Sequence, residues 1–373
     1  MCYFEAQYLL FSRSSMSICR AIRVAQILGL QHVDADDPDQ TSFLPPTRSW
    51  VETEERRRTW WALYCSDRLV GGTTGWPLLI NEQDMTARLP ASEEAFESGT
   101  EEVTSLPQSV LQHNQAFSPF AGRVMAASLF HRAFQHSTET FPRNEPLDPR
   151  TTIYWKRHQQ IDNDLVLLMQ SLPEHLRLPR QIRCRNAVFV NIIIHMSIMV
   201  LHKATISAAA SLTESEGKMR RSKDRLTCAA EEILNIFRML PDAREHLKNS
   251  ILAFSVYLTS QVLLESFVPA EDDFHQMENL DFILRIMLLS SQTFDNPVSG
   301  STAVQLATEM RQRGLDSPAV EMVRRHSARS RCIIRPRHLR GVKPRHPAPS
   351  SSSPGATAGR TSHSQHAPVS TIA

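Results

Sequence analysis

Apolar residues recur every three or four positions along most of the chain, which is the period of an amphipathic helix. Ile18, Ile22 and Ala25 share one face of such a helix, and Gly29 interrupts the pattern. Two-residue alternation is scarce, so few strands are expected. The pattern predicts helices over Met16–Leu30, Thr53–Val70, Ser118–Gln135, Arg150–Ser171, Arg185–Ala210, Lys218–Leu240, Ser250–Phe267, Phe274–Leu289 and, more weakly, Ala303–Arg313. The predicted fold is therefore all-α, with many helices.

The composition changes sharply near residue 324. From there to residue 373 the chain is rich in proline, arginine, histidine and serine, and it contains no acidic residue. This composition cannot bury enough apolar surface to order itself, which predicts a disordered basic C-terminal tail over 324–373. The predicted domains are then 1–290, a terminal helix and linker over 291–323, and the tail. The acidic segment Glu93–Pro107 is predicted to be an exposed loop.

The most apolar segment of the chain is Ala187–Leu201, and it raises the question of a membrane span. Asn191 and His195 interrupt it, and it is too short before His202 to cross a bilayer. A buried core helix is therefore the favoured interpretation, and no membrane partner is expected.

The formal net charge of +2 hides an asymmetry between the body and the tail. Residues 1–321 contain 31 Lys and Arg against 39 Asp and Glu, a net of −8, which makes the body a poor general surface for nucleic acid. The tail is a candidate nuclear import or nucleic-acid segment. Its basic residues for that role are Arg324, Arg325, Arg329, Arg331, Arg335, Arg337, Arg340, Lys343 and Arg345.

Signatures of catalysis and cofactor binding do not occur in the sequence. It contains no phosphate-binding loop, no dinucleotide-binding turn, no nucleophile elbow and no HExxH zinc helix. The six cysteines are scattered without a C-x-x-C pair, which is typical of reduced thiols. His195 and His202 could share a helix face, but two ligands do not make a metal site, so they are interpreted as core or interface histidines. We therefore predict no catalytic residue, no metal ligand and no enzyme activity.

The helix predicted over Thr53–Val70 has an unusual composition, with three arginines followed by two adjacent tryptophans. Thr53 is a candidate N-cap, and glycines at positions 71, 72 and 75 are expected to end the helix. Trp61, Tyr64 and Arg68 share one face, because they are spaced three and seven residues apart. A neighbouring face carries Trp60, Leu63 and Asp67.

The arginine run Arg56–Arg58 allows two interpretations. The three side chains could bind phosphates, or they could pair with Glu54, Glu55 and other carboxylates of the acidic body. A charge run on one helix is usually a solvated or paired face, which favours the ion pairs.

The ordered set of motifs over residues 17–90 resembles the fungal-specific transcription factor domain, the middle homology region of zinc-cluster activators. The first part is the segment Ser17–Gln31, close to an A-x-R-x-A-x-x-L-G-L-H helix, with Gln31 in place of the usual histidine. An E-x-R-R-R-x-W-W-x-x-Y-x-x-D-R helix and a G-R-P turn follow, with Trp76 in place of the usual arginine. The signature residues are Glu55, Arg56, Arg57, Arg58, Trp60, Trp61, Tyr64, Asp67, Arg68, Gly75 and Pro77.

This resemblance implies a nuclear regulator of RNA polymerase II genes, whose residues 1–290 form the regulatory domain. The six-cysteine zinc cluster of such proteins does not occur in the sequence, so DNA contact is expected only through a missing N-terminal zinc cluster. The resemblance also implies transcription machinery or co-regulators as partners, with a homodimer and a small-metabolite effector as further candidates. The alternative is a standalone helical protein that dimerises with, or inhibits, a full-length relative.

Overall fold

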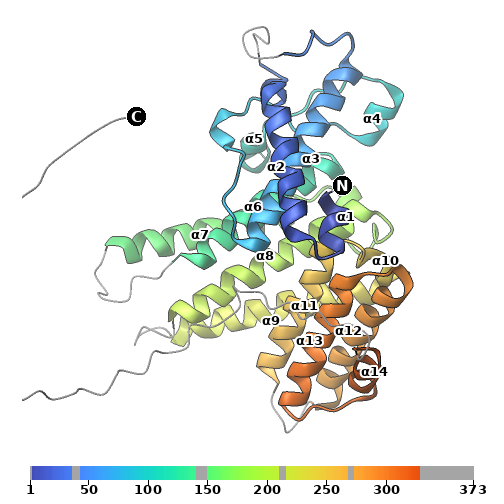
Figure 1. Ribbon diagram of the computed structural model, residues 1–373. Helices are drawn as coiled ribbons and strands as arrows, with labels where there is room; N and C mark the ends of the chain where they lie inside the picture. Colours follow the sequence, from blue (N-terminus) through green and yellow to red (C-terminus); the bar gives the residue numbers. More distant parts are fainter. Residues whose placement is uncertain are drawn as a thin grey trace, which may run out of the picture. The chain divides into compact units, whose positions relative to one another are not determined.

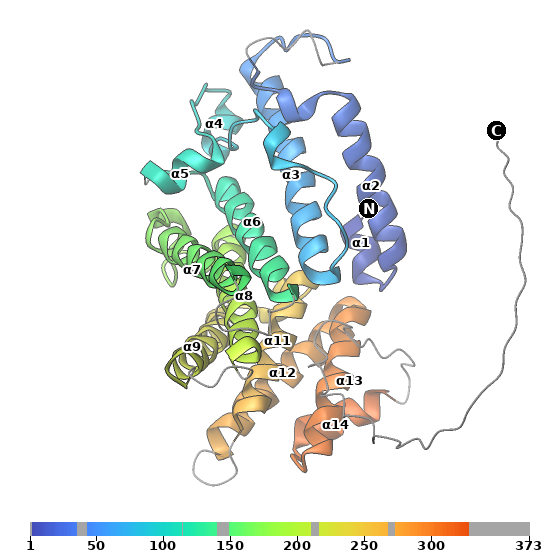
Figure 2. The same cartoon turned by 90° about the vertical axis from the view of Figure 1, so that its left-hand side faces the viewer.

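The computed structural model describes residues 2–35, 43–113, 115–139, 149–209, 216–267 and 273–327. The chain divides into two compact units, Met1–His338 and Leu339–Ala373, and every described residue belongs to the first. Within the described residues, fourteen α-helices and three short 3-10 helices occur and no strand is found, which confirms the all-α prediction (Figures 1 and 2).

The N-terminal helices are α1 (Cys2–Gln7), α2 (Phe11–Ile27), α3 (Trp50–Thr74), α4 (Glu93–Ser98), α5 (Pro107–His113) and α6 (Pro119–Thr138). The remaining helices are α7 (Pro149–Gln170), α8 (Arg185–Ala209), α9 (Glu216–Met239), α10 (Ala243–His246), α11 (Ser250–Ser266), α12 (Asp273–Phe294), α13 (Pro297–Gln312) and α14 (Pro318–Ser327). Short 3-10 turns lie at η1 (Leu30–His32), η3 (Glu82–Asp84) and η4 (Glu174–Leu176).

Helix α8 is the central element of the first unit. It packs against α6, α7, α9 and α11, so it joins the N-terminal helices to the C-terminal ones (Figure 2). By length and composition the segment Arg185–Ala208 could span a membrane, but 72% of its most apolar window is buried by other helices. A helix that is apolar on all sides is expected in the core of a large helical protein, as the sequence predicted.

Helix α3 begins and ends at different residues from those predicted. The hydroxyl of Ser49, not Thr53, caps its N-terminus by accepting a hydrogen bond from the Glu52 amide at 3.3 Å. The helix continues through Gly71 and Gly72 and stops at Gly75, which adopts a left-handed φ of 74°. Position 72 requires glycine because α6 packs closely there: a Cβ would lie 2.5 Å from the Phe130 ring.

One other expectation needs correction. The segment 93–107 is not a continuous loop, because Ser92 caps α4 and Gly99 ends it with a φ of 71°. The pattern did not reveal α4 because it buries no residue. The predicted domain boundaries at 290 and 323 stay predictions; helices α12 and α14 continue through these two positions.

The basic tail is only partly described. Arg324 and Arg325 belong to the last turn of α14, where both contact Glu321. The other candidate import residues lie outside the described residues: Arg329, Arg331, Arg335, Arg337, Arg340, Lys343 and Arg345. The disorder predicted for the tail therefore stays a prediction.

Candidate functional site at helix α3

Six of the signature residues of α3 are buried, and they lie on several sides of the helix. The exposed fraction is at most 5% for Arg57, Trp60, Trp61, Tyr64, Asp67 and Arg68. They are covered partly by α6 and partly by residues 79–92, a segment that runs back along α3 and is called the strap below. A helix buried in this way has no single apolar stripe, so charged side chains must find partners inside the fold.

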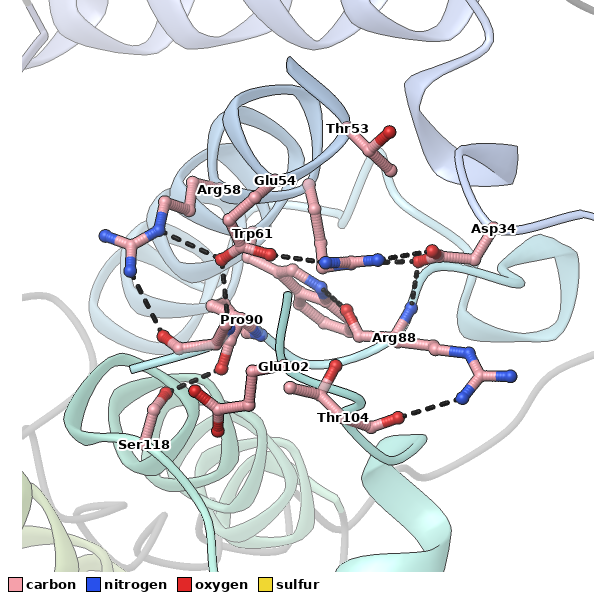
Figure 3. Close-up of polar contacts among 12 residues, drawn as sticks. Asp34, Thr53, Glu54, Arg58, Trp61, Arg88, Pro90, Glu102, Thr104 and Ser118 are labelled. Atoms are coloured by element: carbon pink, nitrogen blue, oxygen red, sulfur yellow. Dashed lines mark hydrogen bonds and ion pairs between the residues drawn. The ribbon is translucent and has the colours of Figure 1, made fainter. Parts of the chain in front are cut away.

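Glu54 lies at the centre of this site, with no exposed surface. Its carboxylate accepts hydrogen bonds from the guanidinium groups of Arg57 and Arg58, the latter at 2.9 Å, and from the Ala91 amide of the strap at 2.9 Å. Figure 3 shows these groups converging on one carboxylate. A buried charge with several charge-assisted partners is stable only while those partners remain in place.

The other side of Arg57 faces Asp34, which follows η1. The Arg57 Nε donates to Asp34 at 3.0 Å, and the same carboxylate accepts the Arg88 amide of the strap at 2.7 Å (Figure 3). Burial alone would lower the pKa of Arg57, but hydrogen bonds and charge pairing with Asp34 and Glu54 outweigh it and raise that pKa. Asp34 therefore joins α3, η1 and the strap.

Arg58 joins α3 to α4. Its guanidinium contacts Glu93 at 2.8 Å and donates to the carbonyl oxygens of Ala91 and Ser92 at 3.1 Å. It also lies 4.2 Å from the centre of the Phe96 ring. The arginine is thus held by a carboxylate, by main-chain oxygens and by an aromatic face.

The tryptophans supply the apolar part of the site. Trp60 and Trp61 are each 1% exposed. The Trp61 Nε1 donates to the Arg88 carbonyl oxygen at 2.6 Å, so even the polar atom of this ring binds the strap (Figure 3). The rings of Trp61 and Tyr64 meet edge to face at 5.0 Å, which agrees with the predicted shared face.

Asp67 and Arg68 form a second polar centre, farther along α3. Asp67 accepts the amides of Leu79 and Ile80 at 3.1 to 3.2 Å, and it contacts Arg68 at 3.1 Å. Arg68 donates to the Ile80 carbonyl oxygen at 3.0 Å and to the Glu82 carboxylate at 3.1 Å. These contacts fix the start of the strap, just as Glu54 and Arg58 fix its end.

Tyr64 completes the second centre. Its hydroxyl donates to Glu82, and its ring lies 4.4 Å below the Arg68 guanidinium. Burial raises the pKa of Tyr64, with the Glu82 charge adding to the effect. Burial would also raise the pKa of Glu82, but the Tyr64 hydrogen bond and the Arg68 charge outweigh it and lower that pKa. At neutral pH the phenol is protonated and the carboxylate is charged.

The remaining signature residues lie at the edge of the site. Arg56 contacts Glu52 and the Pro45 carbonyl oxygen, both at 2.9 Å. Glu55 is exposed and is not a partner of the arginines, contrary to the sequence interpretation, because its position on the helix points away from them. Gly75 and Pro77 form the exposed turn that leads from α3 to the strap.

The chemistry available here is that of a structural core. All three arginines of the run 56–58 contact carboxylates of this chain, so their charge is already neutralised. Cys65 is the nearest candidate nucleophile, but burial raises the pKa of its thiol to about 12. A thiol with that pKa is protonated and unreactive at neutral pH.

A cluster of histidines on α6, α7 and α8 was not predicted. The rings of His136 and His158 lie 5.6 Å apart, and those of His158 and His202 are also 5.6 Å apart. The Tyr154 ring packs against His136, which is completely buried, with the two ring centres 4.2 Å apart and the planes tilted by 33°. No motif revealed this cluster, because its members come from three helices and no sequence spacing connects them.

His202 is well bonded within this cluster. It contacts Ser222 at 3.3 Å, accepts a hydrogen bond from Arg225 at 3.2 Å and lies 3.4 Å from Asp162. His195 does not join the cluster, and burial lowers its pKa to about 4. His202 is thus a buried residue of the core, whereas His195 is only partly buried.

The described residues do not fit a zinc cluster. In them, no group of three or more histidine, cysteine or acidic side chains could hold a metal ion. The described free cysteines with assigned exposure, at positions 19, 65, 184 and 228, lie on or beside different helices, whereas a zinc cluster draws closely spaced thiolates together.

Comparison with known proteins identifies the region that contains this site. Residues 1–141 match the model of the fungal specific transcription factor domain, which confirms the resemblance for that part of the chain. The predicted extent to residue 290 stays a prediction. No solved structure matches the chain.

The relatives are fungal transcription factors. The pigment biosynthesis transcriptional activator pigB of Monascus ruber is 28% identical over 66% of this chain and 45% of its own length. The citrinin biosynthesis transcriptional activator ctnR of Monascus purpureus is 29% identical over 62% of this chain and 40% of its own. The azaphilone cluster-specific transcription factor azaR of Aspergillus niger is 32% identical over 46% of this chain and 38% of its own length. The chain thus spans less than half the length of these relatives.

Proposed function

We propose, from the fungal specific transcription factor domain over residues 1–141, that the chain is the regulatory module of a transcription regulator of RNA polymerase II genes. The observation that carries the proposal is that the α3 signature forms the buried core of this same matched segment. In this role the chain works in the nucleus, restrains or relays activation, and catalyses no reaction.

The partners and targets are part of the proposal. DNA contact in such a regulator would come from a zinc cluster outside this sequence, and co-regulators or the transcription machinery would bind the helical body. A homodimer is a further candidate assembly. The relatives are named for pigment, citrinin and azaphilone biosynthesis, so we propose that the target genes make a small organic molecule.

A small-metabolite effector also belongs to this proposal. A surface hollow of about 520 Å³ between α12 and α14 is a candidate place for it, because ligand pockets commonly have volumes of this order. Its lining combines three apolar and four polar or basic side chains: Leu288, Leu289, Met322, Arg285, Gln292, Arg325 and His326. Such a lining suits a largely apolar molecule with a few polar groups.

A tethering experiment tests the proposed function. The full chain is fused to a bacterial DNA-binding domain and expressed in a filamentous fungus that carries a reporter gene with matching binding sites. We expect the fusion to change reporter transcription, in either direction, relative to the DNA-binding domain alone. A fusion that is present in the nucleus and bound to its sites but leaves transcription unchanged would contradict the proposal.

A second arm of the experiment distinguishes a regulatory module from the alternative, a standalone protein that inhibits a full-length relative. The untethered chain is expressed together with a full-length relative that drives its own reporter. An inhibitor acting in trans would lower that reporter while leaving the tethered reporter unchanged. A regulatory module would give the opposite pattern.

A further inference from the structure

Helix α2 has two different faces. Its inner face buries Ile18, Ile22 and Ala25 where the helix packs on α3. Its other side points away from the neighbouring helices in both views of the fold (Figures 1 and 2).

Five residues with helical spacing form this other side, here called the α2 outer face: Met16, Arg20, Arg23, Val24 and Ile27. Successive residues of this face are separated by four, three, one and three positions. On an α-helix this spacing places all five within an arc of about 100° around the helix axis. The apolar members are large and about half exposed, at 55%, 54% and 51% for the residues at positions 16, 24 and 27. Single exposed apolar residues are common, but a row of them along one helix marks an interaction site.

The charges of this face distinguish it from the arginine run of α3. Arg20 and Arg23 are exposed, and neither has a hydrogen bond or ion pair within the described part of the chain. From residue 6 to residue 33 the sequence contains no aspartate or glutamate. As far as the described residues extend, the α2 outer face therefore combines an apolar row with two unpaired positive charges, on a body whose residues 1–321 have a net charge of −8.

This combination selects among the occupants that such a face could have. A second copy of the chain, docked symmetrically through α2, would place arginines against arginines, which is unfavourable. Nucleic acid would satisfy the arginines but would leave the apolar side chains without apolar partners. An amphipathic helix with an apolar row flanked by carboxylates satisfies both.

We propose that the α2 outer face is a docking surface for an acidic amphipathic helix of a partner protein. The apolar row of the partner packs on Met16, Val24 and Ile27, and its carboxylates pair with Arg20 and Arg23. This inference goes beyond the proposed function, because it names a surface and the chemistry of what binds there. The binding experiment below does not depend on any effect on transcription.

The test uses the full chain and three fluorescent peptides of equal length. The first is a designed helix with leucines on one stripe and glutamates beside it. The second has the same composition in shuffled order, and the third replaces each glutamate by lysine. Fluorescence anisotropy gives the Kd of each peptide, and analytical ultracentrifugation records whether the chain itself dimerises.

Charge reversal makes the test specific. The double variant Arg20→Glu/Arg23→Glu removes the basic charge from exposed positions, so folding is expected to be unaffected. The matched control, Arg220→Glu/Arg221→Glu, makes the same charge change on exposed residues of α9. Circular dichroism checks that both variants keep their helices.

We expect the acidic helix to bind the parent chain saturably, the shuffled peptide at least tenfold more weakly, and the lysine peptide not measurably. The α2 variant should lose at least tenfold in affinity for the acidic helix and gain affinity for the lysine helix, whereas the α9 control should keep the parent Kd. Equal loss in both variants, or no saturable binding to the parent, would overturn the proposal. Dimerisation through α2 that the same reversal abolishes would assign the face to a second copy instead.

Discussion

Glu54 and Glu55 are neighbours in sequence, yet their surroundings are opposite. Glu54 is completely buried between Arg57, Arg58 and the strap, whereas Glu55 is exposed. Removal of a charge from a buried ion pair leaves its partners buried without compensation. The role of a glutamate at this point of α3 therefore depends on its position on the helix and not on its type.

We predict that Glu54→Gln lowers the free energy of unfolding by about 3–5 kcal/mol, because Arg57 and Arg58 each lose one of their two carboxylate partners at a completely buried position. Glu55→Gln is the matched control and should change it by less than about 0.5 kcal/mol. Urea unfolding followed by circular dichroism measures both. Similar small losses in the two variants would show that the centre at Glu54 adds little to stability.

The histidine cluster predicts a pH dependence of stability. Burial lowers the pKa of both His136 and His158 to about 4, with the Arg157 charge adding to the effect at His136 and the neighbouring histidines at His158. The unfolded chain, with ordinary histidine pKa values near 6.5, then binds protons more readily than the folded chain. This contribution to stability is complete above about pH 6.5, and it is lost as the pH falls toward 4.

At pH 5.5 the free energy of unfolding is expected to be lower by about 1 kcal/mol for each of these two histidines, His136 and His158. Thermal melts at pH 7.5 and 5.5 measure it as a drop in Tm. His136→Phe keeps an aromatic ring against Tyr154 and should reduce that drop, whereas His275→Gln, on an exposed part of α12, should leave it unchanged. The same drop in the parent and in His136→Phe would exclude this origin.

At the scale of single elements, the sequence predicted the long helices well. The segments later seen as α6, α7, α8, α9, α11 and α12 carry clear periodicity, because each has a distinct buried side or is buried throughout. The sequence did not predict α4, which buries no residue. It also did not predict that α3 continues through Gly71 and Gly72. Glycine usually signals a helix end, but at these positions it provides room for a neighbouring chain segment.

That packing role makes Gly72 sensitive to a single added carbon. A Cβ there would meet the Phe130 ring at 2.5 Å, so we predict that Gly72→Ala lowers the free energy of unfolding by about 1–3 kcal/mol. Gly217 in α9 has no atom within 4 Å of its would-be Cβ, and Gly217→Ala should be neutral or stabilising by up to about 1 kcal/mol. Chemical denaturation compares the two variants. Equal effects would mean that α3 and α6 do not approach so closely.

Across the whole molecule, the sequence predicted the fold class and the family region but not the contacts among charged groups. It favoured ion pairs for the arginine run, and it could not identify Asp34 and Glu93 as partners, because these are distant in sequence. The histidine cluster was missed for the same reason. Periodicity reports which side of a helix is buried, whereas partners from other elements depend on the tertiary packing.

The basic tail gives a prediction at the scale of the molecule. Deletion of residues 328–345 removes seven of the nine candidate import residues and keeps all of α14. We expect a fluorescent fusion of the full chain to accumulate in the nucleus and the deleted form to remain in the cytoplasm. A deletion of 346–373 is the control, since it removes only Arg360 among the basic residues. Nuclear accumulation of both forms would assign import to another segment.

Apart from the Glu82 carboxylate, which binds Tyr64 and Arg68, the strap contributes mainly main-chain groups to its polar contacts with α3. Side chains of the helix bind main-chain groups of the strap, as Trp61 binds the Arg88 carbonyl oxygen and Asp67 binds the Leu79 amide. Every amino acid supplies a carbonyl oxygen, and all but proline supply an amide. The helix therefore has few acceptable residues at its contact positions, while exposed strap positions such as Leu79 are free to vary. Under this constraint, substitutions would be tolerated less often at the contact positions of α3 than at the exposed positions of the strap.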